Sequence, residues 1–197
     1  MKKLLITGFD PFGGAALNPA WLAVQALPDV VGAYALTKLE IPTVFGEAAK
    51  AVLAAAEGCC PDVILCVGLA AGREAVTLER IAVNIRDARI PDNAGNQPRG
   101  EFVAPEGPAA YFATVPVKAM AQAIRNAGLP GTVSNSAGAF VCNDTLYVLL
   151  HHYAGTETKV GFLHVPQLPE QGSPSLPLAQ TITALTCAIS ALDLQKT

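Results

Sequence analysis

The sequence predicts an α/β fold, with one three-layer α/β/α domain (residues 1–197) around a twisted, mostly parallel sheet that can include antiparallel strands. The main observation is that short apolar runs alternate with longer, helix-like segments along the whole chain. The second is the length of 197 residues, which suits a single domain. The third is the composition, 51% hydrophobic and only 15% charged, which is typical of a globular protein rather than a disordered one.

The first half of the chain begins with an apolar run at 4–9, which predicts a buried strand that ends at the Gly-rich loop GFDPFGG. Asn18-Pro19 predicts a helix start, because Asn is a good N-cap and Pro fits the first helical position. The other elements predicted here are a strand at 33–41, a helix at 44–58, a strand at 62–68 and a strand at 76–85.

The second half opens with a stretch rich in Gly, Pro and Asn, 87–108, which predicts a long and therefore functional loop. The pattern then predicts a strand at 111–115, a helix at 116–128, a strand at 132–136, a helix from about 140, a strand at 159–165, a Pro-rich loop at 167–177 and a closing helix at 176–194. Active sites in such folds lie outside the carboxyl ends of the strands. We therefore expect the loops after the first strand, 132–136 and 159–165 to meet at one edge.

Composition also excludes several partners. The net charge is −3 and no basic stripe is present, which argues against nucleic acid. The apolar run near the N-terminus is too short for a signal peptide or a membrane span. The five cysteines have no metal-ligand spacing, so we expect free thiols, no bound metal and a cytoplasmic protein. Cys66 and Cys187 lie in apolar runs and are predicted to be core residues.

Cys142 is the first candidate for chemistry. It follows a glycine turn and falls in the first turn of a predicted helix, where unpaired N–H groups and the helix dipole lower a thiol pKa. The alternative is a buried structural cysteine. The base would be His164, at the end of a strand, because His151 and His152 lie nine and ten residues beyond Cys142 on the same helix. At ~1.5 Å per residue they are roughly 13–15 Å away.

Glu79 is the candidate for the group that orients the imidazole. It is a carboxylate within a partly apolar strand, where an unpaired charge is costly. A third group that holds the imidazole improves a Cys–His pair. The alternative for Glu79 is a surface position paired with Arg80 or Arg86, and the alternative for His164 is a satisfied core or turn histidine.

Two long motifs resemble a known family. GLAAGREAVTLERIAVN (68–84) is similar to the glutamate signature of the pyrrolidone-carboxylate peptidases, also called pyroglutamyl-peptidase I, and VSNSAGAFVCNDTLY (133–147) to their cysteine signature. The family order continues in ITGFDPFGG with Asn18-Pro19, DARIPDN (87–93) and FLHVP (162–166). The resemblance implies a cysteine peptidase that removes an N-terminal pyroglutamyl residue from peptides, needs no cofactor and forms a homodimer or homotetramer.

The resemblance also implies roles for individual residues. It maps the nucleophile to Cys142, the base and acid to His164 and the orienting carboxylate to Glu79. It implies that Arg89 helps to hold the oxyanion. The family positions that line the lactam pocket correspond here to Phe9, Phe12, Phe140, Val141 and Ile90.

One motif position differs from the family pattern, and this difference leaves room for functions other than peptide hydrolysis. Many members read GQAGGR where this chain reads GLAAGR, so Leu69 cannot supply a side-chain amide to substrate. A non-catalytic protein that binds pyroglutamyl peptides is therefore one alternative. A nucleoside-phosphorylase-like enzyme is another, although no phosphate motif is complete. A serine nucleophile at Ser134 or Ser136 is disfavoured, because neither lies in a G-x-S-x-G elbow.

Overall fold

The computed structural model describes residues 1–194 and confirms the α/β class. The strands are β1 (Lys2–Phe9), β2 (Val30–Val31), β3 (Tyr34–Ile41), β4 (Val63–Leu69), β5 (Val76–Glu79), β6 (Ile81–Val83), β7 (Arg86–Asp87), β8 (Arg99–Glu101), β9 (Ala110–Phe112), β10 (Gly131–Ser134) and β11 (Lys159–Val165). The helices are α1 (Pro19–Gln25), α2 (Glu47–Cys59), α3 (Val117–Asn126), α4 (Val141–His152) and α5 (Leu178–Ser190), with a 3₁₀ turn at Pro169–Gln171.

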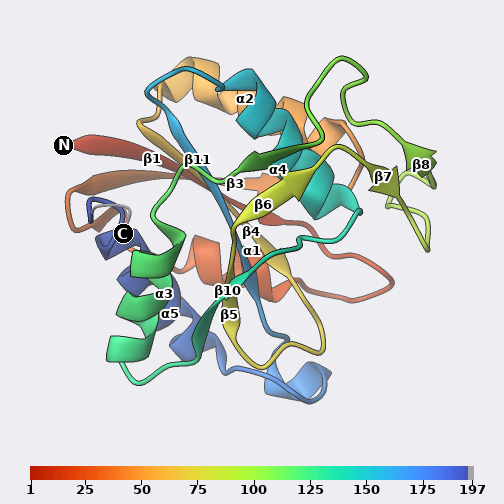
Figure 1. Cartoon of the computed structure of the whole chain (residues 1–197). Helices are drawn as coiled ribbons and strands as arrows, with labels where there is room; N and C mark the ends of the chain where they lie inside the picture. Colours follow the sequence, from red (N-terminus) through yellow and green to blue (C-terminus); the bar gives the residue numbers. More distant parts are fainter. Residues whose placement is uncertain (195–197) are drawn as a thin grey trace.

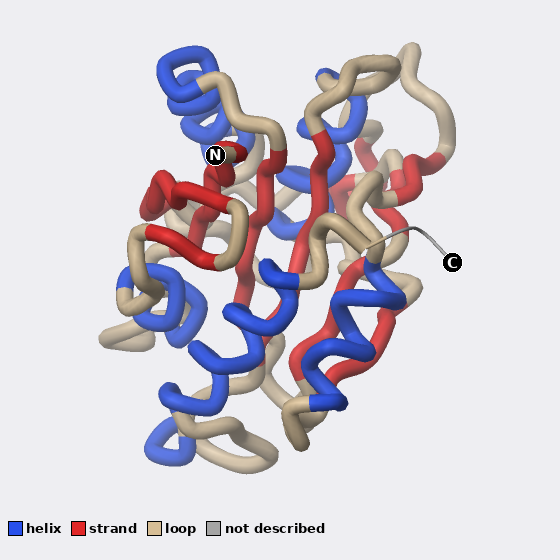
Figure 2. Tube along the Cα trace, turned by 90° about the vertical axis from the view of Figure 1, so that its left-hand side faces the viewer, coloured by secondary structure: helices blue, strands red, loops and turns tan. Residues whose placement is uncertain are grey.

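A seven-stranded sheet in the order β10-β5-β11-β4-β1-β3-β2 crosses the middle of the molecule, with helices on both sides (Figures 1 and 2). Strands β1, β3, β4 and β11 run parallel to one another. Strand β5 runs antiparallel to β11, and β10 follows β5, so the sheet is mixed. The expectation that three carboxyl ends meet at one edge is therefore wrong for β10. Residues 135–140 lead from its end to the start of α4.

The period of two along each strand divides the core into two layers. Leu4 and Ile6 face a cluster that includes side chains of α1, α3 and α5, whereas Leu5 and Phe9 face a cluster with α2 and α4. Figure 1 shows α2 and α4 together on one side of the sheet and α3 and α5 on the other. The same alternation puts Cys66 of β4 and Phe162 of β11 on the side of α2 and α4.

Local signals that depend on neighbouring residues are confirmed. Asn18 caps α1, since its Oδ1 accepts a hydrogen bond from the Ala20 N–H at 3.0 Å, and Pro19 is the first helical residue.

Two expectations about the strands and loops needed correction. The strand predicted at 76–85 is broken at Arg80 into β5, in the main sheet, and β6, which pairs with β9. The loop predicted at 87–108 contains β8, which pairs with β7 in a small hairpin that projects from the molecule (Figure 1).

Asp10 and Asp92 hold together the loops that follow β1, β3 and β7. Asp10 accepts hydrogen bonds from the Thr43 N–H at 2.7 Å and the Asn93 amide at 3.1 Å. Asp92 is buried and accepts the Phe45 N–H at 2.9 Å, and it also accepts the N–H groups of Ala94 and Asn96. The loop after β1 is thereby tied to the loop after β7.

Candidate active site

A small cavity opens where β1, β4, α1 and α4 meet. Its volume is about 110 Å³, only a few times the roughly 30 Å³ that one water occupies in the liquid and well below the roughly 300–1,000 Å³ of drug-sized sites. Its lining residues are Phe9, Phe12, Ala15, Leu17, Asn18, Thr43, Leu69, Phe140 and Cys142. The ring centroids of Phe12 and Phe140 lie 5.3 Å apart. The cavity therefore suits one small, flat, uncharged group.

Cys142 is the second residue of α4, as the sequence predicts. Gly138 has φ of +78°, a left-handed conformation that glycine adopts without strain, and Phe140 is the extended N-cap. No side chain caps this helix start, so N–H groups of its first turn remain available to a ligand.

Asn143 and Asp144 fix the start of α4 against the rest of the fold. The Asn143 amide bonds the N–H and C=O of Val83, at 2.9 Å each. The carboxylate of Asp144 accepts the Arg86 Nε at 2.6 Å and the Gly46 N–H at 2.8 Å. Both residues are fully buried, so the position of Cys142 is set by buried hydrogen bonds on either side of the helix start.

The thiol of Cys142 lies over Gly68 of β4, the strand next to the one that carries His164. A Cβ atom added at Gly68 would lie 3.1 Å from the Cys142 Sγ. Gly68 is the register partner of His164 in the parallel pair β4–β11. His164 is two residues beyond Phe162 on β11, so the two side chains point to the same face of the sheet, the face that α4 covers. The nucleophile candidate and the base candidate thus come from a helix and a strand that pack face to face.

His164 and Glu79 form a buried pair. His164 Nδ1 lies 2.8 Å from Glu79 Oε1, and the two residues are 4% and 0% exposed. An ionised carboxylate only accepts hydrogen bonds, so Nδ1 carries the proton and Nε2 is the free basic nitrogen. Glu79 also bonds Arg73, whose Nη1 lies 2.6 Å from the same Oε1. The arginine partner is therefore neither Arg80 nor Arg86.

The pKa values of this pair follow from burial and hydrogen bonding. Burial lowers the pKa of His164 below its ordinary value, although the hydrogen bond and charge of Glu79 oppose this. Burial alone would raise the pKa of Glu79, but the hydrogen bond and charge of His164, with the side chains of Ser134 and Arg73, hold it below its usual range. At neutral pH the pair is therefore a neutral imidazole beside a carboxylate, which is the state that a general base requires.

The expectation of a lowered thiol pKa is wrong for the unliganded protein. Burial raises the pKa of Cys142 to about 12, and the charges of Cys66 and Glu79 add to this. Arg73 and the backbone N–H of Cys142 itself act in the lowering direction, but their effect is smaller. The helix terminus thus acts as predicted and is outweighed by desolvation. The free protein holds a thiol, not a thiolate.

The other predicted residues divide into three groups. Phe9, Phe12, Phe140 and Leu69 line the cavity. Val141 is fully buried in the core cluster of α2 and α4. Arg89 and Ile90 are exposed, and neither lines the cavity.

Sequence reasoning missed three residues. Asn18 and Thr43 line the cavity, although Asn18 was predicted only as a helix cap. Arg73 lies six residues before its partner Glu79, within the same motif. A carboxylate in a buried strand indicates that a cation lies nearby. The sequence has several arginines close to Glu79, and nothing in it shows which of them is the partner.

The remaining histidines and cysteines lie apart from this arrangement. His151 and His152 are exposed near the end of α4, and His151 Nδ1 lies 2.8 Å from the Tyr111 hydroxyl. All five cysteines are free thiols. Cys66 is buried as expected, Cys187 is half-buried against the core, and Cys60 is exposed. Within residues 1–194, every helix is too short or too polar to span a lipid bilayer.

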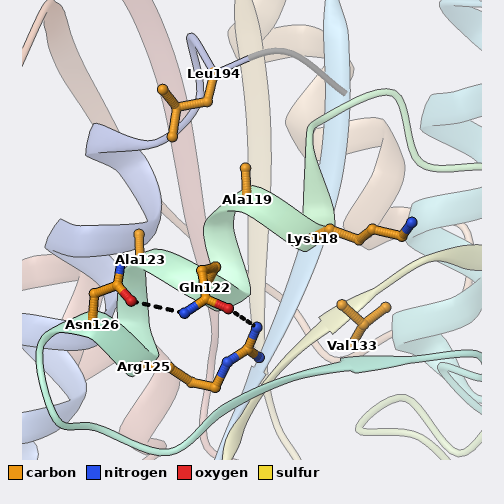
Figure 3. Close-up of a pocket in the computed structure, with 8 residues that line it drawn as sticks. All are labelled: Lys118, Ala119, Gln122, Ala123, Arg125, Asn126, Val133 and Leu194. Carbon is orange, nitrogen blue, oxygen red and sulfur yellow. Dashed lines mark hydrogen bonds between the residues drawn. The ribbon is translucent and has the colours of Figure 1, made fainter. Parts of the chain in front are cut away.

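A larger hollow, of about 610 Å³, lies over α3 and is shown in Figure 3. Its amide and guanidinium groups already bond one another or the backbone. The Gln122 amide donates to Asn126 at 2.7 Å, and Arg125 donates to Gln122 at 2.6 Å and to the Gly131 carbonyl at 2.8 Å. None of Cys142, His164 and Glu79 lines it, so size alone does not identify the reactive site in this protein.

Comparison with known proteins points to one family. The family model described as pyroglutamyl peptidase matches residues 2–195. The chain is 53% identical over 197 residues to the pyrrolidone-carboxylate peptidase of Levilactobacillus brevis, which covers 96% of this chain and 97% of the relative. It is 46% identical over 198 residues to that of Yersinia pestis, with 96% and 92% covered.

Solved structures agree. The crystal structure of pyroglutamyl peptidase I from Bacillus amyloliquefaciens has a TM-score of 0.96 at 41% identity and covers 100% of this chain and 98% of that one. The pyrrolidone carboxyl peptidase from Thermococcus litoralis has a TM-score of 0.93 at 37% identity, with 98% and 93% covered.

Proposed function

Because this chain belongs to the pyroglutamyl peptidase family, we propose that it removes the N-terminal pyroglutamyl residue from peptides by acyl transfer through Cys142, His164 and Glu79. The observation that carries this proposal is the buried hydrogen bond of 2.8 Å between His164 and Glu79. The Cys142 sulfur lies over Gly68, which is the register partner of His164. The family match over residues 2–195 favours this reaction over the nucleoside-phosphorylase alternative.

The reaction begins at the thiol. Nε2 of His164 takes the Cys142 proton as the sulfur attacks the pyroglutamyl carbonyl carbon, and the carbonyl oxygen becomes an oxyanion. When the tetrahedral intermediate collapses, the C–N bond breaks and His164 gives that proton to the leaving amine. Water, deprotonated by His164, then hydrolyses the thioester and releases pyroglutamate and the free thiol. Since the free enzyme holds a thiol, proton transfer is coupled to substrate binding rather than completed before it.

The oxyanion needs donors that are in place before it forms. The uncapped N–H at Cys142 is one, and its availability supports this role. Arg89 is the second donor in this proposal. Its side chain is exposed and makes no hydrogen bond within the described part of the chain, so it is free to turn toward a bound substrate.

Specificity follows from the cavity. Its volume of about 110 Å³ and its Phe9, Phe12 and Phe140 rings favour an uncharged ring beside the scissile carbonyl. A free N-terminal glutamine carries an ammonium group, and burying that charge without a partner is costly. Leu69 faces this cavity without an amide group, so any polar contact to the lactam at this position is made by backbone.

The experiment is release of a chromophore from an L-pyroglutamyl amide by the wild type and Cys142→Ala, in reducing buffer with a chelator. We expect activity in the wild type alone, because the proposed chemistry requires the thiol and no metal. Comparable activity in Cys142→Ala would end the proposal. Binding of the amide without turnover by a folded wild type would favour the non-catalytic alternative.

We also propose a cytoplasmic homodimer or homotetramer. Five free thiols suit a reducing compartment. Ile90, Phe102 and Phe112 are each more than half exposed, which suits association of copies. Sedimentation at several concentrations measures the assembly, and a monomer at all of them contradicts this part.

A further inference from the structure

Arg73 connects two parts of the site that come from different elements. Its Nη1 donates to Glu79 Oε1 at 2.6 Å and to the Thr77 hydroxyl at 2.5 Å, both on β5. Its Nη2 donates to the Ser136 carbonyl at 3.2 Å, in the segment that leads into α4. The Ser136 carbonyl also accepts the Ser134 hydroxyl at 3.1 Å. One guanidinium therefore bridges the strand that carries Glu79 and the segment that leads into the helix of Cys142.

We propose that Arg73 is a positioning residue for the reaction, which holds Glu79 as an oriented anion behind His164 and fixes the entry to α4. This inference rests on the proposed function. Glu79 is fully buried, and its second oxygen, Oε2, has no hydrogen-bond partner within residues 1–194. The hydrogen bonds at Oε1, from His164 and Arg73, therefore hold the carboxylate, and the nearby Ser134 side chain also lowers its pKa.

The charge of Arg73 acts on each member of the site in the direction that the reaction needs. It lowers the pKa of His164, which keeps the imidazole neutral, and it lowers that of Cys142, although burial dominates there. Its hydrogen bond also lowers the pKa of Glu79. The ionisable groups that act on His164 or Cys142 are Glu79 from β5, Arg73 from the loop before it and Cys66 from β4. Arg73 is the only cation among these.

Arginine is suited to this place for a geometric reason. Its planar fork makes bonds in two directions at once, whereas lysine provides one compact charge. The side chain is one-third exposed while its partner is buried. The cation therefore remains partly solvated and avoids most of the desolvation cost of a fully buried ion pair.

The test compares Arg73→Met and Arg73→Lys with the wild type on an L-pyroglutamyl amide across pH. In Arg73→Met we expect kcat to fall by roughly 10–100-fold, because small misplacement of a catalytic group has effects of this size, with KM nearly unchanged. Loss of the cation raises the pKa of the imidazole, so the acid limb of kcat/KM moves to higher pH. Arg73→Lys is expected to restore the position of the acid limb, because it keeps the positive charge. It should restore only part of kcat, because one ammonium group cannot bond Glu79 and the Ser136 carbonyl at the same time.

A second measurement separates this inference from the proposed function. The imidazole of His164 is titrated by NMR in the Cys142→Ala background with and without Arg73→Met, and its pKa is expected to be higher in the double variant. If the wild type hydrolyses no pyroglutamyl amide, the proposed function fails while the titration still tests Arg73.

The matched control is Arg99→Met, an exposed arginine on β8, which should match the wild type in both measurements. Wild-type kcat and an unchanged imidazole pKa in Arg73→Met would overturn the inference. If Arg73→Met does not fold, full kcat in Arg73→Lys overturns the positioning role.

Discussion

In the proposed mechanism, Glu79 accepts the Nδ1 proton of His164, so that Nε2 is the nitrogen that exchanges protons with the thiol and the leaving group. Replacement by glutamine presents an amide that can donate instead of accept, which favours the wrong tautomer. The corresponding change in a serine protease triad costs roughly 10⁴ in kcat, so we expect a loss of at least about a hundredfold in Glu79→Gln. Steady-state kinetics measures the loss of kcat, and circular dichroism checks that the variant is folded. The control is Glu74→Gln, at an exposed position. An unchanged kcat in Glu79→Gln would reduce this residue to a structural one.

The pKa shifts of His164 and Cys142 predict how activity and thiol alkylation change with pH. The pKa of His164 is lowered from 6.5, so the imidazole remains neutral below pH 6.5 and the acid limb of kcat/KM lies below that value. The pKa of Cys142 is raised to about 12, so alkylation of the free enzyme by iodoacetamide should accelerate with pH through 9 without a plateau. A plateau at neutral pH would show a preformed thiolate and contradict the role given to burial.

At the scale of the element, α4 can approach β4 because Gly68 has no side chain. A methyl group there would lie 3.1 Å from the Cys142 Sγ and 3.0 Å from the Phe162 ring. We expect Gly68→Ala to lower kcat/KM by roughly 10–100-fold, since the thiol must move relative to His164, and to leave the fold intact. The control is Gly58→Ala, where an added Cβ meets nothing within 4 Å. Equal activity in the two variants would contradict this reasoning.

Asp92 provides the corresponding prediction for the loops. Its Oδ1 and Oδ2 both accept hydrogen bonds, from Ala94, Asn96 and Phe45. The amide of Asp92→Asn turns a donor toward other donors, and one unsatisfied buried group costs about 1–3 kcal/mol. We expect faster proteolysis within 87–98 and a lower unfolding midpoint in urea. Unchanged proteolysis would show that the loop has other anchors.

The predictability of each element depends on the range of its determinants. The cap of α1 and the strand β11 were predicted correctly, because a few adjacent residues decide them. The break at Arg80 was missed, since it depends on β9 pairing with residues after it. The sequence allowed antiparallel strands but did not identify β5 and β10 as the reversed pair, because the pairing of β5 with β11 joins segments that are far apart in the chain.

For the proposed site, both the local sequence pattern and the motif resemblance point to Cys142, His164 and Glu79, but neither points to Arg73, whose partners depend on how 70–75 folds. The thiol pKa was predicted in the wrong direction because the degree of burial around Cys142 is a property of the packed molecule.

At the scale of the whole molecule, three buried groups make stability fall in acid. The pKa of His164 in the folded protein is lowered from 6.5, the value expected in the unfolded chain. Between the folded and the unfolded pKa the unfolded chain binds more protons, so the stability falls as the pH drops below 6.5. Glu79 and Asp92 have folded pKa values lowered from 4.5 and 3.8, so their contribution is lost below those values.

Urea unfolding at a series of pH values should therefore show two descending steps, of which His164→Gln removes the first. Constant stability between pH 7 and 5.5 in the wild type would contradict the assignment to His164.

The reactive side chains of the proposed site lie on one side of the sheet. Cys142, His164 and Glu79 lie on the side of α2 and α4, whereas α3 and α5 cover the other side. Lys118 is exposed on α3 and does not line the cavity, so coupling to a solid support through this residue leaves the cavity residues unmodified.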